Sequence, residues 1–325
     1  MCCQEQRKRQ RSFVGTALFN FGRDGRAKII LAIGEGAANK FYLLITIAIA
    51  RIIAVPLLVT EAPNPGIIHY ETYGRGRPVL FLHGWLGSWA LWRPTIEALG
   101  QEYKTYSLDF WGFGESRGSG ENSANLQSFQ VDSFVEMVSQ FMDKLGIPKA
   151  AVVGHSMGGT VSLNTGIKYP DKVVKACCIG SPINGNSLNL LLKLSGVPAF
   201  AFIVWRFPPL LRMFLRIYSR FMAKDGKKMA AMISQDVSQV TMESFFQSIG
   251  TLRETNLTDQ LNKITMPTLG IYGKRDIIVN PNQRHLLAKG VPHAKVVYIE
   301  DAGHFPMLDT PDLFLETLRN FLKIK

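Results

Sequence analysis

The stretch VVGHSMGG, residues 152–159, places one serine between two glycines, after an apolar run and before a helix-like segment. A serine at a strand-to-helix corner needs strained backbone angles to point its hydroxyl outward, and bulky neighbours two residues away would clash. Gly154 and Gly158 occupy those two positions around Ser156. The following helix would direct free N–H groups at the corner, where they favour a developing negative charge. An ordinary tight turn is the alternative, so the interpretation depends on the rest of the chain.

From residue 67 onward, apolar runs rich in Val, Ile and Leu alternate with helix-like segments. Seven strands are expected, at residues 67–73, 78–83, 104–109, 150–155, 172–179, 267–273 and 294–300. Helices are expected near residues 89–99, 127–145, 157–168 and 282–289, and in a last segment that begins after Thr310. Continuous apolar strands separated by helices are typical of a mostly parallel sheet that is covered on both faces. The pattern therefore predicts an α/β fold with a mostly parallel, doubly wound sheet.

Residues 182–262 interrupt this alternation, because they contain no comparable strand. The segment looks helical and is unusually apolar, so we expect a helical cap inserted into a core made of residues 66–181 and 263–325. A basic residue recurs every four positions in one predicted helix of this cap, at Arg212, Arg216, Arg220 and Lys224. This spacing places the four on one side of the helix, where they are either solvated or rest on an anionic membrane surface.

Residues 1–65 form a basic N-terminal segment that differs in composition from the rest of the chain. Its apolar run FYLLITIAIARIIAVPLLVT, residues 41–60, has about the length that spans a bilayer. Arg51 near the centre would cost about 3 kcal/mol, against about −4 to −7 kcal/mol from the apolar side chains. A helix lying flat in the interface and a helix packed on the body are alternatives. We expect a membrane-associated protein with one N-terminal apolar helix, spanning or interfacial; a cytoplasmic protein is the alternative.

The composition suits a globular protein with a large core, because 46% of the 325 residues are hydrophobic and 19% are charged. A net charge of +12 raises the possibility of a nucleic-acid partner. The chain shows no zinc-finger spacing, RNP-like aromatic motif or recognition helix, so no nucleic acid is expected. A membrane surface is the better partner, because the basic residues stand beside apolar stretches. The sequence does not indicate an oligomeric state.

A nucleophilic serine needs a base, and the base needs an acid that orients it. His304 is the candidate base, because it follows the last expected strand, and loops after parallel strands carry the sites of such sheets. Asp276 follows the preceding strand and is the candidate acid. Asp301 is a weaker rival, because it is too close to His304 in sequence to reach around the ring easily. We predict a triad of Ser156, Asp276 and His304, although a plain loop histidine and a turn aspartate remain alternatives.

A serine nucleophile also requires two N–H donors that hold the negative oxygen of the tetrahedral intermediate. The residue after the nucleophile, Met157, supplies one backbone N–H. The second is expected from a loop after an earlier strand, where residues 83–85 read His-Gly-Trp. The backbone N–H groups of Trp85 and Met157 are therefore the predicted oxyanion hole.

Taken together, the motifs resemble those of the α/β-hydrolase superfamily across about residues 67–325. Four motifs match in order, namely HGWLGS (83–88), DFWGFGES (109–116), GHSMGG (154–159) and the pair GKRD (273–276) and GHFPMLDTP (303–311). The resemblance implies a capped, esterase- or lipase-like serine hydrolase with a nucleophile elbow at Ser156. It also implies that DFWGFGES is an architectural turn and that residues 182–262 cover the site. Family members with aspartate at the elbow are dehalogenases or epoxide hydrolases, so Ser156 favours esters, thioesters or related acyl groups.

We therefore predict a serine hydrolase that cleaves a carboxylic ester or thioester of an apolar or lipid-like small molecule through an acyl-enzyme. No cofactor and no metal are expected. The triad does not separate this activity from haloperoxidase-like, C–C-bond hydrolase or peptidase activity on the same fold. A non-catalytic, membrane-bound binding protein of that fold is the alternative from another class, and the complete triad argues against it.

Overall fold

The computed structural model describes residues 67–116, 129–195, 222–237 and 240–323. It also describes six positions between residues 207 and 219 and the backbone of three short N-terminal strands. These strands are β1 (Leu18–Phe21), β2 (Ala27–Leu31) and β3 (Leu57–Thr60). The predicted basic stripe of the cap falls almost entirely outside the described residues, with only Lys224 among them.

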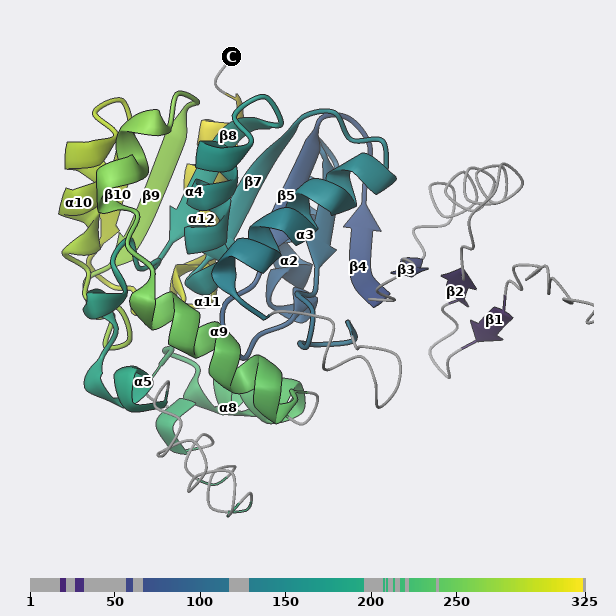
Figure 1. The fold of residues 1–325 in the computed structure, drawn as a ribbon, viewed down its shortest axis with the longest axis horizontal. Coiled ribbons are helices and arrows are strands. Elements are labelled where there is room, and N and C mark those ends of the chain that lie inside the picture. Colours follow the sequence, from purple (N-terminus) through teal and green to yellow (C-terminus); the bar gives the residue numbers. More distant parts are fainter. Residues whose placement is uncertain are drawn as a thin grey trace, which may run out of the picture.

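A mostly parallel sheet runs through the centre of the molecule (Figure 1). Its seven strands from residue 67 onward are β4 (Ile67–Tyr73), β5 (Pro78–Leu82), β6 (Lys104–Leu108), β7 (Ala150–His155), β8 (Val173–Ile179), β9 (Thr268–Gly273) and β10 (Lys295–Ile299). Their order in the sheet is β4-β6-β5-β7-β8-β9-β10, and β4 alone among them pairs antiparallel. The predicted α/β class and all seven expected strands are confirmed.

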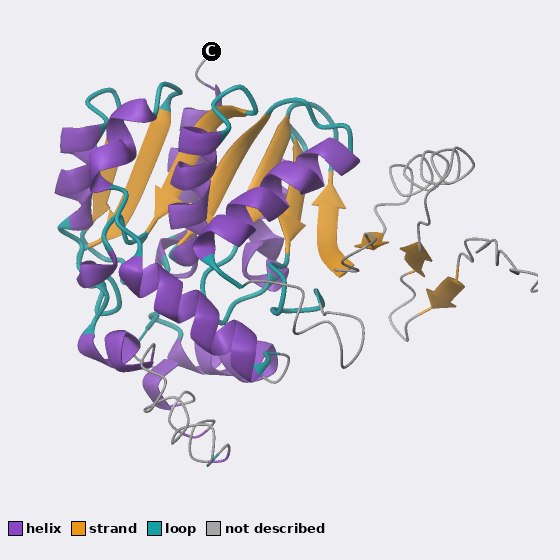
Figure 2. Cartoon of the chain, in the orientation of Figure 1, coloured by secondary structure: helices purple, strands orange, loops and turns teal. Residues whose placement is uncertain are grey.

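Helices cover both faces of this sheet (Figure 2). They are α2 (Arg93–Leu99), α3 (Val131–Lys144), α4 (Met157–Lys168), α10 (Gln283–Gly290), α11 (Pro306–Asp309) and α12 (Pro311–Lys323), with a 3-10 turn η1 (Trp89–Trp92) before α2. Neighbouring strand residues alternate between two buried clusters, because successive side chains point to opposite faces. Val152 packs in the cluster of Phe134 on α3, and Val153 packs in the cluster of Phe314 on α12. Burial on both faces explains why these strands read as continuous apolar runs.

The chain between β8 and β9 forms η2 (Gly185–Ser187), α5 (Leu190–Ser195), α8 (Gly226–Val237), α9 (Met242–Glu254) and η4 (Thr258–Lys263). Its described residues contain no strand, as the sequence predicted for residues 182–262. In Figure 1, α5, α8 and α9 lie beside the edge of the sheet at which the parallel strands end. The insertion therefore lies at the same edge as the loops that follow the strands.

The predicted apolar helix at residues 41–60 is wrong at its C-terminal end, and residues 41–56 lie outside the described part of the chain. Leu57–Thr60 form strand β3, which pairs antiparallel with β4. Pro56 directly precedes this strand and lacks the N–H that a helix interior requires, while Val59 and Thr60 are β-branched residues that favour strands. Among the described residues, no helix has the length and apolar character of a membrane span.

Candidate active site

Ser156 occupies a strained corner between β7 and α4. Its backbone angles are φ 53° and ψ −120°, so it lies in a region that residues with a side chain rarely adopt. A Cβ on Gly154 would lie 2.0 Å from the carbonyl oxygen of Gly158, and one on Gly158 would lie 2.4 Å from that of Leu82. Neither position can hold a larger residue without backbone movement. The predicted strand, strained turn and helix are confirmed, and the role of Ser156 as nucleophile stays a prediction.

His304 and Asp276 are brought together from the loops after β10 and β9. The Nδ1 atom of His304 lies 2.8 Å from Oδ2 of Asp276, and both side chains are buried. The other oxygen of Asp276 accepts hydrogen bonds from the backbone N–H groups of Ile278 and Val279. These bonds hold the carboxylate in place, so that it keeps the proton on Nδ1 of His304 and leaves Nε2 available as a base.

Asp301, the weaker candidate for the acid, points away from this pair. Its carboxylate forms an exposed ion pair with Arg275 at 2.8 Å. Of the two aspartates weighed from the sequence, only Asp276 contacts the ring of His304. The separation of 28 residues between Asp276 and His304 lets two loops approach the ring from different sides.

Two further residues shape the position of His304 and were missed by sequence reasoning in this role. Gly180, at φ +54°, directly follows β8, and a Cβ there would lie 3.2 Å from Nδ1 of His304 and 3.4 Å from Oδ2 of Asp276. The Nε2–H of His155 donates to the backbone carbonyl of His304 at 2.9 Å. Burial lowers the pKa of His155 well below its ordinary value, so its ring stays neutral. The position of Gly180 directly after an apolar strand could have indicated its role from the sequence. No sequence pattern indicated the contact between His155 and His304.

The loop at residues 83–88 passes directly beside the corner. A Cβ on Gly84 would lie 3.1 Å from Cβ of Ser156. Nδ1–H of His83 donates to the carbonyl of Gly84 at 2.7 Å, and Nε2 accepts from the N–H of Phe110 at 2.9 Å. Burial lowers the pKa of His83, which agrees with a neutral ring that donates at one nitrogen and accepts at the other. His83 therefore holds the loop in position and is not a base.

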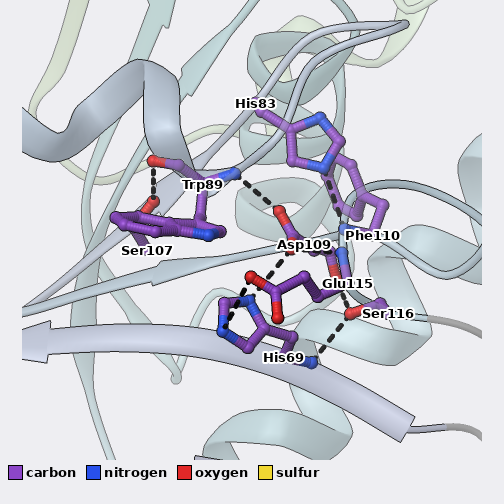
Figure 3. A network of polar contacts seen from close by, with 8 residues as sticks. All are labelled: His69, His83, Trp89, Ser107, Asp109, Phe110, Glu115 and Ser116. Carbon is purple, nitrogen blue, oxygen red and sulfur yellow. Dashed lines mark hydrogen bonds and ion pairs between the residues drawn. The ribbon is translucent and has the colours of Figure 1, made fainter. Parts of the chain in front are cut away.

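Asp109 is the first residue of the turn at residues 109–116, and it connects this turn to η1, which directly follows the loop at residues 83–88 (Figure 3). Its carboxylate accepts from the N–H of Trp89 at 2.6 Å and from the N–H of Glu115 at 2.9 Å. Nδ1 of His69 lies 3.0 Å from the same carboxylate, which raises the pKa of His69 against the opposing effect of burial. The DFWGFGES turn is thus an architectural element, in the sense that its first residue fixes the start of η1.

The predicted oxyanion donors are both near Ser156, because Met157 follows it in the chain and Trp85 follows Gly84, which lies beside it. Trp85 lines the cavity described below, and its indole N–H donates to the carbonyl of Phe245 on α9 at 3.1 Å. Met157 is fully buried at the start of α4. Within the described residues, no acceptor takes the backbone N–H of Trp85 or of Met157. Their assignment as the oxyanion hole stays a prediction.

One cavity of about 360 Å³ contains Ser156 and His304 in its wall. This volume is in the range of small-molecule sites. The insertion between β8 and β9 contributes most of the remaining wall, and its side chains there are mainly apolar, including Leu191, Leu192, Met229, Met232, Ile233, Phe245, Phe246, Ile249 and Leu252. The candidate nucleophile and base therefore face a pocket that suits an apolar molecule. The described residues contain no group of three His, Cys, Asp or Glu side chains placed to hold a metal ion.

Comparisons with known proteins agree with the fold. The profile of a family described as "alpha/beta hydrolase fold" matches residues 77–311. The pimeloyl-(acyl-carrier protein) methyl ester esterase of Aliivibrio salmonicida (strain LFI1238) is 26% identical over 267 residues, which cover 79% of this chain and 96% of that protein. Bifunctional epoxide hydrolase 2 of Mus musculus is 24% identical over 292 residues, covering 76% of this chain and 52% of that protein.

Solved structures give the same fold. A thermophilic esterase from Thermogutta terrifontis superimposes with a TM-score of 0.70 at 22% identity, covering 83% of this chain and 98% of that one. At this identity the likeness speaks for the fold alone. The relatives include both ester- and epoxide-cleaving enzymes, so the chemistry has to be argued from the residues of the site.

Proposed function

This chain belongs to the α/β hydrolase fold family and is a hydrolase of that fold, and we propose that it cleaves a carboxylic ester or thioester of an apolar substrate. The observation that carries the proposal is the buried pair of His304 and Asp276, of which His304 lines one apolar cavity together with the strained Ser156. Related proteins named as esterases support the ester class.

The proposed reaction begins when Oγ of Ser156 attacks the carbonyl carbon and Nε2 of His304 takes the hydroxyl proton. The negative oxygen of the tetrahedral intermediate accepts hydrogen bonds from the backbone N–H groups of Trp85 and Met157. When the carbon–oxygen or carbon–sulfur bond breaks, His304 returns the proton to the leaving alcohol or thiol. Water then attacks the acyl-enzyme with His304 as base, which releases the acid and restores Ser156.

The inserted helices are proposed to act as the cap of this site. Side chains from α5, α8 and α9 complete the cavity wall, and Trp85 is bonded to α9 through its indole. An apolar wall excludes water from the acyl chain and strengthens the hydrogen bonds to the oxyanion. The cap thus favours an apolar acyl or alcohol portion in the substrate.

A panel of 4-nitrophenyl esters from short to long acyl chains tests the proposal, together with labelling by a fluorophosphonate probe. We expect the wild type to hydrolyse the medium and long esters and to be labelled at Ser156. Ser156→Ala should lose labelling and nearly all turnover, while Ser234→Ala, at an exposed position of α8, should keep both. Turnover by Ser156→Ala equal to that of the wild type would disprove the serine mechanism.

We also propose that the protein associates with a membrane surface. Several large apolar side chains are exposed on or near the insertion, namely Leu190, Leu194, Phe207, Met213, Ile217 and Ile277. Phe207 also lines the cavity, so this apolar surface is continuous with the site. Exposed apolar groups on a chain with a net charge of +12 suit an anionic lipid surface.

Sedimentation with phosphatidylserine and phosphatidylcholine vesicles tests this association. We expect binding to the anionic vesicles that weakens as salt increases, because salt screens the basic residues. A double change of Leu190→Asp and Ile217→Asp should weaken binding further if the exposed apolar groups enter the interface. Absence of binding to either vesicle by the full chain would refute the association without affecting the proposed hydrolysis.

A further inference from the structure

A single carboxyl group stands out in the apolar wall of the cavity. Asp236 lies one residue before the end of α8, and it lines the cavity together with Met229, Met232 and Ile233 of the same helix. Among the described residues of the wall, it is the only acidic one, and none is a lysine or an arginine. It is not a member of the predicted triad, and no sequence motif pointed to it.

A carboxyl group at such a position is costly unless it has hydrogen-bond partners. Its partner is the side chain of Ser88, which directly follows the cavity-lining loop that ends at Gly87. No ion pair joins Asp236 to a basic side chain in the part of the chain that the structure describes. The carboxyl therefore has further hydrogen-bonding capacity within an otherwise apolar site.

Burial raises the pKa of Asp236 to about 7, and the nearby carboxylate of Asp109 acts in the same direction. At neutral pH a large share of the group is therefore uncharged, and an uncharged carboxyl can both donate and accept. A neutral group in an apolar wall suits a neutral polar partner, because a cation would lose its hydration on reaching the cavity.

We propose that Asp236 forms a polar subsite that binds a hydroxyl or amide N–H group, carried by an apolar substrate away from its reacting carbonyl. The inference rests on the proposed ester hydrolysis and adds a determinant of specificity to it. A purely apolar substrate would cover Asp236 and leave part of its hydrogen-bonding capacity unused, which costs free energy. A substrate with a matching donor recovers that loss and is preferred.

Kinetics on matched esters test the subsite. The probes are 4-nitrophenyl octanoate and its analogues with a hydroxyl at carbon 6, 7 or 8, and the 8-amino analogue is included as a cation. We expect one hydroxy ester to exceed the parent about tenfold in kcat/KM. Asp236→Leu should abolish that preference, and Asp236→Asn, which retains polar atoms, should keep part of it. Ser234→Ala and Asp312→Asn, both at exposed positions, should preserve the preference.

Two kinetic outcomes would overturn the proposal. If Asp236→Leu slows the parent and the hydroxy ester equally, the carboxyl only holds α8 against Ser88. If the amino ester is preferred and no hydroxy ester is, the subsite is one for cations.

A binding measurement keeps the subsite testable even if no ester is hydrolysed, which would count against the proposed function instead. 1-Octanol and 1-methoxyheptane are isomers that differ in whether they carry a hydroxyl donor. Calorimetry should show tighter binding of 1-octanol to the wild type, by about tenfold, and loss of that difference in Asp236→Leu. Equal binding of the two isomers to the wild type would overturn the subsite.

Discussion

Asp276 uses its two carboxylate oxygens for different purposes. One accepts from the backbone N–H groups of Ile278 and Val279, and the other faces Nδ1 of His304 at 2.8 Å. The first set of bonds fixes the direction of the second, so the orientation of His304 depends on the turn that follows β9. Ser156 is fixed differently, by a backbone conformation that only its glycine neighbours permit.

Replacing Asp276 tests whether its carboxylate orients His304. Asp276→Asn should lower kcat by about 10²–10⁴-fold, because an amide no longer holds the proton on Nδ1 and no longer stabilises the imidazolium. The measurement is kcat on a 4-nitrophenyl ester with folding verified by circular dichroism. Asp301→Asn is the matched control, since Asp301 pairs with exposed Arg275, and it should retain wild-type turnover. The opposite ranking of the two variants would move the acid to Asp301.

A methyl group at the corner should prevent its formation. In Gly154→Ala the new Cβ would lie 2.0 Å from the Gly158 carbonyl, so we expect a loss of more than about 3 kcal/mol in the free energy of unfolding. Denaturant unfolding measures the loss. Gly146→Ala offers a control with φ +63° and no atom within 4 Å of the added Cβ, where strain alone should cost about 1–2 kcal/mol. Equal losses in both variants would show that crowding at the corner is unimportant.

At the scale of elements, α8 carries both apolar side chains and one acid into the cavity wall. Met229, Ala230 and Ile233 are buried at helical spacing, whereas Asp236 continues the same face with a carboxyl. A helix that only covered the core would gain more from an apolar residue at that position. Asp236 should therefore affect the free energy of unfolding of the protein as well as its substrate specificity.

The effect of Asp236 on the free energy of unfolding should depend on pH. The pKa of an aspartate in an unfolded chain is about 3.9, whereas burial in the folded protein raises the pKa of Asp236 to about 7. Between these values the folded protein holds more protons than the unfolded chain, so the contribution of Asp236 to stability falls as pH rises. The stability of Asp236→Asn relative to the wild type should therefore grow by roughly 2–4 kcal/mol between about pH 4 and about pH 8.

Urea unfolding across this pH range measures the effect. Asp312→Asn, at an exposed position in the first turn of α12, controls for the loss of one negative charge. If the difference in the free energy of unfolding between Asp236→Asn and the wild type does not change with pH, folding does not raise the pKa of Asp236.

For the whole molecule, the site is contained in one part of the chain. Every described residue that lines the cavity lies between Gly84 and Phe305. The N-terminal strands join the sheet beyond this region, where β3 pairs with the edge of β4. The described lining of the candidate site therefore includes no residue of β1, β2 or β3.

A chain that starts at Pro65 should therefore keep kcat/KM on 4-nitrophenyl octanoate within about threefold of the full chain, because none of the described cavity-lining residues is removed. Its vesicle binding should be weaker, since it lacks the basic N-terminal segment. Size-exclusion chromatography checks whether the exposed edge of β4 leads to association. Loss of hydrolysis by a folded, monodisperse truncated protein would place part of the site before residue 65.

Features that depend on neighbours along the chain could be predicted from the amino-acid sequence. The seven strands follow from continuous apolar runs, and α4 occupies the predicted residues 157–168, beginning directly after the strained turn at Ser156. Local pattern also placed Asp276 and His304 in loops at one edge of the sheet, because parallel strands all end there. It failed at residues 57–60, where pairing with β4 and the position after Pro56 outweighed a run of apolar residues.

Contacts between groups that are distant in the chain could be known from the folded structure alone. The bond from His155 to the carbonyl of His304 spans 149 residues, and that from Trp85 to Phe245 spans 160. Asp236 looks like one more polar residue of an amphipathic helix until α8 is placed over the cavity beside Ser88. Hydrophobic periodicity predicts which face of a helix is buried, but it does not predict which residues that face contacts. The reason is that the hydrophobic effect depends on buried area, whereas a hydrogen bond depends on the position and direction of two particular groups. For that reason hydrolysis could be predicted from the sequence, whereas the proposed polar subsite at Asp236 could be inferred only from the folded structure.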